Sequence, residues 1–433
     1  MNQALANTSS VSASEDATYL KVTWRLIPFL LVCYIIAYLD RVNVGFAKLQ
    51  MQSALGFSDV VYGLGAGMFF IGYFFFEVPS NIILHRVGAR RWIARIMVTW
   101  GVISASMMFV ETEMQFYVIR FLLGVAEAGF FPGIILYLTY WYPAQRRGRI
   151  VSLFMTGIPL AGVIGGPLSG WIMKTWDQVW GYQGWQWMFL LEALPAIVVG
   201  FMVYWYLDDR ITDAKWLSES ERQMLAQRIE EEDQTKEHMP VMAVLKNKRV
   251  WVMSAIYFSL AMSLYGVSFW LPTIINGMGV KDNLTIGLLS AVPWLAGVFS
   301  MLWFGRSADK HKERRWHLVI PMLMAATGLV LSVLLASNVY LSFLALILAC
   351  MGIVSGIPLF WSLPTSFLAG AAAAAGIAAI NSIANLAGFV APYVVGWLKQ
   401  ITQSTDSGMY MLACVLLIGA AITLTIPGKL VNR

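Results

Sequence analysis

The sequence predicts an all-α membrane protein whose twelve transmembrane helices form two pseudo-symmetric six-helix bundles. Three observations predict this fold class: the composition, the number of long apolar runs, and one long polar stretch that divides them. Of the 433 residues, 58% are hydrophobic and only 12% are charged, whereas soluble domains carry about 25% charged residues. So few charges suit a surface that faces lipid instead of water.

Twelve runs of about 20 mostly apolar residues are long enough to cross a bilayer. The first six cover residues 25–47, 60–84, 92–110, 115–141, 150–173 and 186–207. The last six cover residues 250–275, 284–304, 317–336, 339–363, 374–398 and 409–426. The chain therefore divides into a tail at 1–24, an N-terminal bundle at 25–207, a linker at 208–249 and a C-terminal bundle at 250–433.

The two long polar segments have different compositions. Residues 1–18 are small and polar, which predicts a short disordered tail and no cleavable signal. The linker carries Ser218 and Glu221 at the spacing of a helix cap, followed by a charged run to residue 232. We expect a solvated helix there that joins the two bundles.

Basic residues in the short loops predict the orientation of the chain, because cytoplasmic loops are rich in Lys and Arg. One set of loops holds three basic clusters, and the alternate set holds only isolated lysines. The clusters are Arg86, Arg90, Arg91 and Arg95; Arg146, Arg147 and Arg149; and Arg306, Lys310, Lys312, Arg314 and Arg315. We therefore expect a multi-pass protein of the cytoplasmic (inner) membrane with both termini and the linker in the cytoplasm.

Small residues surround a proline at matched places in the two halves. The fifth and eleventh spans contain them in the order Gly162, Gly166, Pro167, Gly170 and Gly388, Ala391, Pro392, Gly396. This pattern predicts close helix packing and a kink, used twice. Two six-helix halves with a binding site between them at mid-membrane are typical of transporters.

Several function classes lack their sequence signatures. The three cysteines lie far apart in apolar runs, so neither a disulfide framework nor a metal site is predicted. No phosphate-binding loop, dinucleotide fingerprint or paired-histidine motif occurs, and the net charge of +6 comes from loop residues. We expect no enzyme activity, cofactor, metal or nucleic-acid partner, and we expect a monomer in the lipid bilayer.

Ionisable side chains inside a span are costly and usually mark a pathway. Asp40 lies about 10 Å from the outer end of the first span, and Arg120 about 8 Å from the outer end of the fourth. We expect these two residues to form an interhelical ion pair, because each charge alone would be strongly penalised. Glu127 follows two turns deeper than Arg120, as a lone carboxylate near the membrane centre.

Two carboxylates in different environments could couple proton entry to substrate binding. An Asp held by an Arg stays ionised, whereas a lone central Glu binds protons readily. Asp40, Glu127 and Arg120 are therefore the candidate proton-coupling residues, with the proton as the coupling ion. The alternative is a structural ion pair beside a hydrogen-bonded, silent Glu127.

Arg41 is the candidate anion-binding residue. It points about 100° away from Asp40 around the helix and is free to face a central cavity. A guanidinium binds a carboxylate through two parallel hydrogen bonds. The alternative is that Arg41 extends toward the outer interface. The other candidates for the cavity wall are Tyr38, Tyr73, Trp361, Asn381 and Asn385. Asn381 and Asn385 share one helix face, because they lie four residues apart. For each of these residues the alternative is a role in helix packing.

Residues 38–43 (YLDRVN), residues 120–132 (RFLLGVAEAGFFP) and residues 364–370 followed by an alanine run and Asn381 carry a family resemblance. The chain resembles the major facilitator superfamily and, within it, the anion:cation symporters that include tartrate, phthalate and galactonate permeases. The resemblance implies proton coupling by Asp40 and Glu127 and a substrate-binding arginine at Arg41. It also implies substrate contacts from Tyr38, Tyr73, Trp361 and Asn381.

The loop after the second span departs from the superfamily pattern. The usual Asp is replaced by His85, so the usual gating ion pair is not expected in this loop. The matching loop of the second half keeps an acid, Asp309, and a gating ion pair is expected there. Glu77 lies near the cytoplasmic end of the second span, and we expect it to join a gate with loop arginines such as Arg86 and Arg90. Glu192 is interpreted as structural.

The leading hypothesis is a proton-coupled symporter that imports a small carboxylate or hydroxy-carboxylate by alternating access of the two halves. An organic-anion exchanger or facilitator without obligatory proton coupling is the alternative. A membrane enzyme, a sensor and a channel are disfavoured. Tartrate-like diacids, aldonates and aromatic acids all fit an arginine-bearing polar cavity, so the sequence leaves the anion open.

Overall fold

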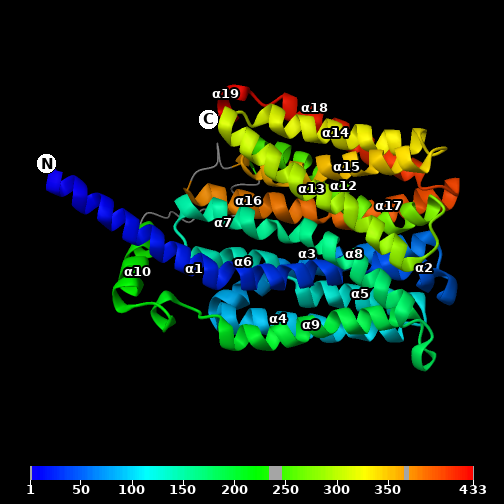
Figure 1. Ribbon diagram of the computed structural model, residues 1–433, viewed down its shortest axis with the longest axis horizontal. Helices are drawn as coiled ribbons and strands as arrows, with labels where there is room; N and C mark the ends of the chain where they lie inside the picture. Colours follow the sequence, from blue (N-terminus) through cyan, green and yellow to red (C-terminus); the bar gives the residue numbers. More distant parts are fainter. Residues whose placement is uncertain (1, 234–245, 365–369, 433) are drawn as a thin grey trace.

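The computed structural model describes residues 2–233, 246–364 and 370–432, and these residues form a long bundle of helices (Figure 1). Twelve spans in it are long and apolar enough to cross a membrane. The all-helical fold class and the number of spans are confirmed. Residues 365–369 of the 364–370 motif, and residues 234–245 of the predicted linker, lie outside the described residues.

The first six spans come from nine helices. They are α1 (Asn2–Val42) with α2 (Val44–Leu55), α3 (Asp59–Val87), α4 (Ala89–Ser106), α5 (Glu113–Glu127) with α6 (Phe130–Thr139), α7 (Ala144–Met155) with α8 (Gly157–Thr175), and α9 (Gly184–Tyr206). The linker helix is α10 (Glu219–Asp233). Its first turn has the expected cap, since the Glu221 amide donates to Ser218 Oγ at 3.3 Å and the Ser218 amide donates to Glu221 at 2.7 Å.

The second six spans come from seven helices. They are α12 (Lys248–Gly277), α13 (Asn283–His311), α14 (Arg315–Leu334), α15 (Val339–Trp361), α16 (Gly370–Asn385) with α17 (Ala387–Thr402), and α18 (Asp406–Leu424). A short α19 (Gly428–Val431) follows. Both chain ends and α10 lie at one end of the bundle, called here the termini side, and α2 lies at the opposite end, called the far side (Figure 1).

Helix breaks interrupt four of the spans in the described part of the chain. They fall at Asn43, at Ala128 with Gly129, at Thr156 and at Leu386. Gly129 adopts a φ of 84°, which glycine tolerates because it has no Cβ. In the fifth and eleventh spans the breaks fall before Pro167 and Pro392, each of which lies inside a continuous helix. Broken helices leave polar backbone groups at membrane depth, where transporters place their binding sites.

The two halves touch closely on the far side through the predicted small residues. A Cβ added to Gly166 of α8 would lie 2.6 Å from the Gly287 carbonyl oxygen of α13. A Cβ added to Gly396 of α17 would lie 2.4 Å from the Asp59 carbonyl oxygen of α3. Close packing at these positions is thus confirmed. Each of the two contacts joins a helix of the N-terminal half to a helix of the C-terminal half.

Ion pairs reinforce the far-side contact. Asp59 of α3 binds Lys48 of α2 at 2.7 Å and Lys399 of α17 at 2.9 Å. Lys174 of α8 binds Asp282, the residue that caps α13, at 2.7 Å. Hydrogen bonds from Lys174 and Thr285 lower the pKa of Asp282 to about 2. The far side is therefore closed in this structure by both backbone contact and charge.

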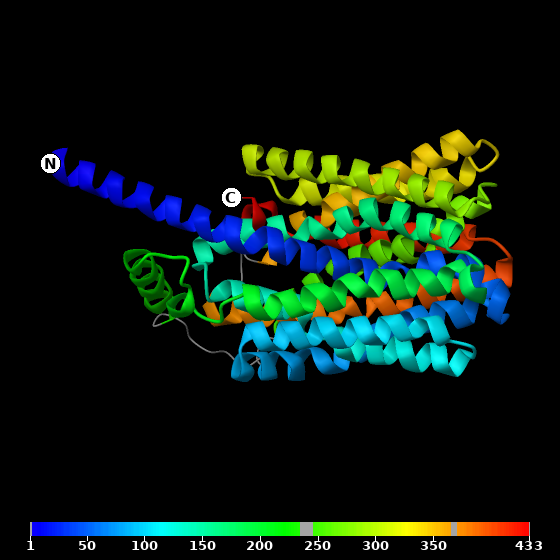
Figure 2. The same ribbon diagram turned by 60° about the horizontal axis from the view of Figure 1, so that its bottom comes forward.

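The predicted disordered tail is wrong. Helix α1 begins at Asn2 and projects beyond the bundle on the termini side (Figure 2). Beside it, Arg228 of α10 binds Glu15 at 3.1 Å, and Glu221 of α10 binds Lys21 at 2.9 Å. The Ser218 amide and Lys21 lower the pKa of Glu221. These ion pairs fasten the linker helix to the N-terminal half.

Candidate functional site

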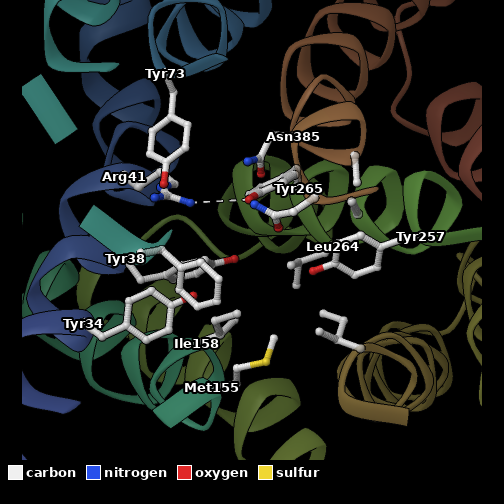
Figure 3. A pocket seen from close by; sticks show the side chains of 15 residues that line it. Tyr34, Tyr38, Arg41, Tyr73, Met155, Ile158, Tyr257, Leu264, Tyr265 and Asn385 are labelled. Atoms are coloured by element: carbon white, nitrogen blue, oxygen red, sulfur yellow. Dashed lines mark hydrogen bonds between the residues drawn. The ribbon is translucent and has the colours of Figure 1, made fainter. Parts of the chain in front are cut away.

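A central cavity lies between the two halves at the level of the helix breaks (Figure 3). About 540 Å³ of space free of atoms lies between its walls, part of it open to solvent. Its N-terminal wall comprises Tyr34, Tyr38, Arg41, Tyr73, Phe131, Met155 and Ile158, and its C-terminal wall comprises Tyr257, Ala261, Leu264, Tyr265, Ile357, Asn381, Ala384 and Asn385. Its walls combine aromatic and aliphatic side chains with polar groups from the tyrosines, Arg41, Asn381 and Asn385, a lining that suits a small polar ligand.

Arg41 is the charged residue of this wall. It sits in the last turn of α1, just before the break at Asn43, and its side chain is buried. Its guanidinium pairs with Glu127 and also donates to the Tyr265 hydroxyl at 3.4 Å, which belongs to the other half. It lies 5.4 Å from the centre of the Tyr73 ring and 5.1 Å from that of Phe69. The structure therefore places Arg41 at the cavity and not at the outer interface.

Glu127 is not the lone carboxylate that the sequence predicted. It is the last residue of α5, fully buried, and its first carboxylate oxygen holds Arg41. Its second carboxylate oxygen and the Arg41 Nε are both buried without a hydrogen-bond partner in the described structure. Unpaired buried polar atoms are costly, so both atoms would gain from a hydrogen bond to water or to a ligand in the cavity.

The expected ion pair between Asp40 and Arg120 is also wrong. Asp40 accepts hydrogen bonds from Trp100 Nε1 at 2.9 Å and Ser104 Oγ at 3.4 Å, both on α4. Arg120 donates instead to backbone carbonyls, at 3.4 Å to Gly65, 3.2 Å to Ala66 and 3.5 Å to Arg41. The two side chains lie at a similar depth but face different neighbours.

Of the other predicted substrate contacts, Tyr38, Tyr73, Asn381 and Asn385 line the cavity. Trp361 does not; its ring packs against Tyr257, with ring centres 4.8 Å apart. It therefore supports the wall from behind.

Sequence reasoning missed three tyrosines of the wall: Tyr34, Tyr257 and Tyr265. A signal for each was available. Tyr34 precedes Tyr38 by one helical turn, and Tyr257 and Tyr265 lie eight residues apart, which puts them on one face of α12. Aromatic residues are common throughout the spans, so this spacing alone did not distinguish a cavity from packing.

Glu77 has different partners from those expected. Its carboxylate is buried and accepts from Asn381 Nδ2 and Ser382 Oγ, each at 3.3 Å, on α16 of the other half. The predicted loop arginines lie elsewhere: Arg86 is exposed, and the Arg90 amide donates to Asp209 at 2.8 Å. Glu77 therefore links the halves directly, one turn beyond Tyr73 toward the termini side.

Asp309 forms an ion pair with Arg314 at 2.6 Å, near the loop between α13 and α14. Its side chain is 71% exposed, and such pairs contribute at most about 1 kcal/mol. Both partners belong to the C-terminal half, so this contact does not join the halves. A gating role for Asp309 stays a prediction.

A two-half helical bundle, broken helices at mid-depth and a polar cavity between the halves define a membrane transporter. The profile of the Major Facilitator Superfamily matches residues 30–392. The chain belongs to the Major Facilitator Superfamily, whose members are transporters and not enzymes.

Two bacterial relatives cover nearly the whole chain. The putative metabolite transport protein NicT of Pseudomonas putida is 48% identical over 99% of this chain and 100% of its own. A putative tartrate transporter of Agrobacterium vitis is 49% identical over 93% of this chain and 90% of its own.

A solved structure shares the fold. A bacterial homologue of the human lysosomal transporter Spinster, in an inward-facing and occupied conformation, superposes with a TM-score of 0.74. It is 15% identical, and the match covers 92% of this chain and 95% of that one.

Proposed function

We propose that this transporter imports a small organic anion together with protons, across the inner membrane of a bacterium. The observation that carries the proposal is the buried pair of Arg41 and Glu127 at the edge of the cavity. A guanidinium is the side chain best suited to hold a carboxylate, and here an internal carboxylate occupies it. The similarity to a putative tartrate transporter supports an acid as the cargo.

The exchange of partners at Arg41 gives the coupling. A proton that neutralises Glu127 releases Arg41, which then binds the carboxylate of the cargo. Loss of that proton restores the pair and displaces the cargo. The proton and the anion thus depend on the same guanidinium, so each favours the arrival of the other.

In alternating access, the two halves rock so that the central cavity opens first to one face of the membrane and then to the other. The far side is closed here by the contacts of Gly166 and Gly396, so cargo would leave or enter from the termini side. The basic loops support a cytoplasmic termini side, because Lys and Arg gather on that face of the membrane. Glu77 bridges the two halves between the central cavity and the termini side, so it lies on the route of the cargo. Asp40 is the second candidate residue for carrying a proton.

Proteoliposomes that contain the purified protein test this proposal. We expect labelled tartrate, an aldonate or phthalate to accumulate when the outside is acidic, and a protonophore to prevent the accumulation. Glu127→Gln should abolish accumulation against a gradient and preserve counterflow. Accumulation that a protonophore leaves unchanged would instead support an exchanger, and accumulation of none of these acids would reject the cargo class.

A further inference from the structure

Glu192 of α9 is a buried carboxylate that the proposed mechanism does not use. It is 2% exposed in the middle of a span. Its carboxylate accepts from Ser169 Oγ at 2.6 Å and from Asn43 Nδ2 at 3.1 Å. Both donors are neutral, and in the described part of the chain no Lys, Arg or His pairs with Glu192. An ionised carboxylate in such surroundings is costly, so the position favours a carboxyl that carries a proton.

A second cavity reaches the partners of Glu192. It holds about 380 Å³ of space free of atoms, part of it open to solvent, and is lined by Tyr38, Asn43, Ser169, Ser268 and Ser290, among apolar residues. The carbonyl oxygen of the Asn43 side chain is buried there without a hydrogen-bond partner in the described structure. Buried polar atoms usually find a partner, and water or a hydrated proton in this cavity would supply one.

Tyr38 separates this second cavity from the central one. Its side chain lines both, and its hydroxyl lies 3.3 Å from Ser268 Oγ of the other half. Because α1 continues into α2 toward the far side, Asn43 lies on the far side of Tyr38. The second cavity is therefore the far-side compartment, and Glu192 borders it through Asn43 and Ser169.

Asp40 is the titratable group next to this site along α1. It lies three residues, about one helical turn, before Asn43, whose side-chain amide donates to Glu192 at 3.1 Å. Of the other charged groups on the helices packed against α9, Arg41 pairs with Glu127 and Lys21 with Glu221, Arg90 lies 3.8 Å from Asp209, and Arg91 lies at the termini-side start of α4. Four more have contacts of their own. Lys48 binds Asp59, Lys174 binds Asp282, Arg95 stacks on Trp92, and Arg25 stacks on Tyr206.

We propose that Glu192 is a proton-carrying residue that passes protons between the far-side cavity and Asp40, an inference that rests on the proposed function. A proton leaves water in the far-side cavity, binds the Glu192 carboxylate and moves on to Asp40 when the halves rearrange. Only O–H bonds form and break. Three carboxyls, Glu192, Asp40 and Glu127, then lie in sequence along the N-terminal half.

Two variants separate this role from a structural one. Glu192→Gln keeps the shape and one acceptor oxygen but cannot titrate, and its NH2 group donates where the second carboxylate oxygen accepted. Ser169→Ala removes the 2.6 Å hydrogen bond but keeps the carboxyl. A structural role predicts that Ser169→Ala does more damage and that both variants keep the wild-type pH profile. A proton-carrying role predicts a flatter pH profile in Glu192→Gln alone.

Infrared spectroscopy of the full-length protein in lipid gives a readout that needs no substrate. We expect a pH-dependent C=O stretching band of a protonated carboxyl that is present in the wild type and in Ser169→Ala and absent from Glu192→Gln. Identical spectra in all three proteins would overturn the proposal.

Transport of labelled tartrate, measured with a pH-sensitive dye, gives the second readout. Because Glu192 hands its proton on to Asp40, Glu192→Gln should slow proton entry and tartrate uptake together, whereas Ser169→Ala should slow neither, and wild-type rates in Glu192→Gln would overturn the proposal. If the wild type itself moves no protons with the anion, the proposed function fails, and the infrared band alone decides whether Glu192 titrates.

Discussion

The two halves share an architecture and differ in their buried chemistry. The buried charged residues are Asp40, Arg41, Lys48, Glu77, Arg120, Glu127 and Glu192, and within the residues whose burial is described all of them belong to the N-terminal half. The buried polar residues of the C-terminal half are hydroxyls: Ser254, Ser259, Ser263, Ser268, Ser290, Ser300, Ser332, Ser342, Ser355 and Thr423. The repeat therefore preserves the fold and not the chemistry.

Most of these hydroxyls bond their own helix. Ser254 donates to the Val250 carbonyl at 2.8 Å, and Ser290 donates to the Ile286 carbonyl at 2.7 Å, one turn back in each case. Such bonds satisfy the hydroxyl locally and leave little for a ligand. The comparison teaches that the N-terminal half holds the buried charges, while the C-terminal half lines the cavity with uncharged polar groups such as Tyr265, Asn381 and Asn385.

The largest expected effect tests the charged half. Arg41→Ala removes the guanidinium and leaves Glu127 buried without its partner. Hydrogen bonds to charged groups contribute about 1.5–3 kcal/mol, so binding should weaken about 10- to 150-fold. Calorimetric titration of the purified protein with a transported acid measures this loss. Binding within threefold of the wild type would show that the cargo does not depend on Arg41.

The next largest effect tests the far-side contact between the two halves. Gly166→Val forces a side chain against the Gly287 carbonyl oxygen, where a Cβ would lie only 2.6 Å away. Overpacking of this kind costs about 1–3 kcal/mol, which predicts a roughly tenfold fall in uptake because the far side no longer closes. Gly165→Ala is the matched control, since its Cβ would meet Leu39 at an ordinary 3.5 Å. Equal uptake by both variants would contradict the inference that close packing at Gly166 closes the far side.

A smaller effect tests the uncharged half. Tyr265→Phe removes one hydrogen bond to Arg41 and should raise KM about three- to tenfold, as for the loss of about 1 kcal/mol. The pH profile of uptake should stay unchanged, because the Tyr265 hydroxyl only accepts a hydrogen bond from Arg41 and carries no proton of the proposed coupling. A shifted profile would assign part of the coupling to the C-terminal half. Tyr34→Phe, which removes a hydroxyl from the opposite wall, gives the comparison.

The smallest effect concerns the exposed bridge between Lys174 and Asp282. Because the pKa of Asp282 is lowered to about 2 from an ordinary value of 3.8, its contribution is present above pH 3.8 and is lost as the pH falls through about 2. The bridge is therefore intact throughout pH 5–8. Asp282→Asn should change uptake less than about twofold and leave the pH profile parallel to that of the wild type. A profile that differs between pH 5 and 8 would contradict this.

The fold could be predicted from the sequence because composition and span length act over hundreds of residues. The site was predicted in part. The depth of a residue in the membrane follows from the rise of 1.5 Å per residue along a helix. The depths of Asp40, Arg120 and Glu127 in their spans could therefore be predicted. Depth does not determine which way a side chain faces, and the breaks at Asn43 and Gly129 turn the helix ends. Arg41 therefore meets Glu127, and Asp40 meets Trp100.

Partners across the halves were the least predictable. Glu77 was expected to meet loop arginines that are near in sequence, and it meets Asn381 and Ser382 on α16 instead. Tyr265 reaches Arg41 from a helix that the sequence marked only as apolar. Contacts between elements more than 200 residues apart depend on how the halves dock, which no local pattern records.

The uncharged wall of the C-terminal half has an evolutionary consequence. A substitution at Tyr257, Ala261, Leu264 or Ile357 changes the shape of the cavity without leaving a buried charge unpaired. On the proposed mechanism, gene lineages can therefore acquire new cargo acids through that wall while Asp40, Arg41 and Glu127 stay fixed. Sequence divergence among paralogues with different cargoes should gather there, and directed evolution toward a new acid should begin with those four positions.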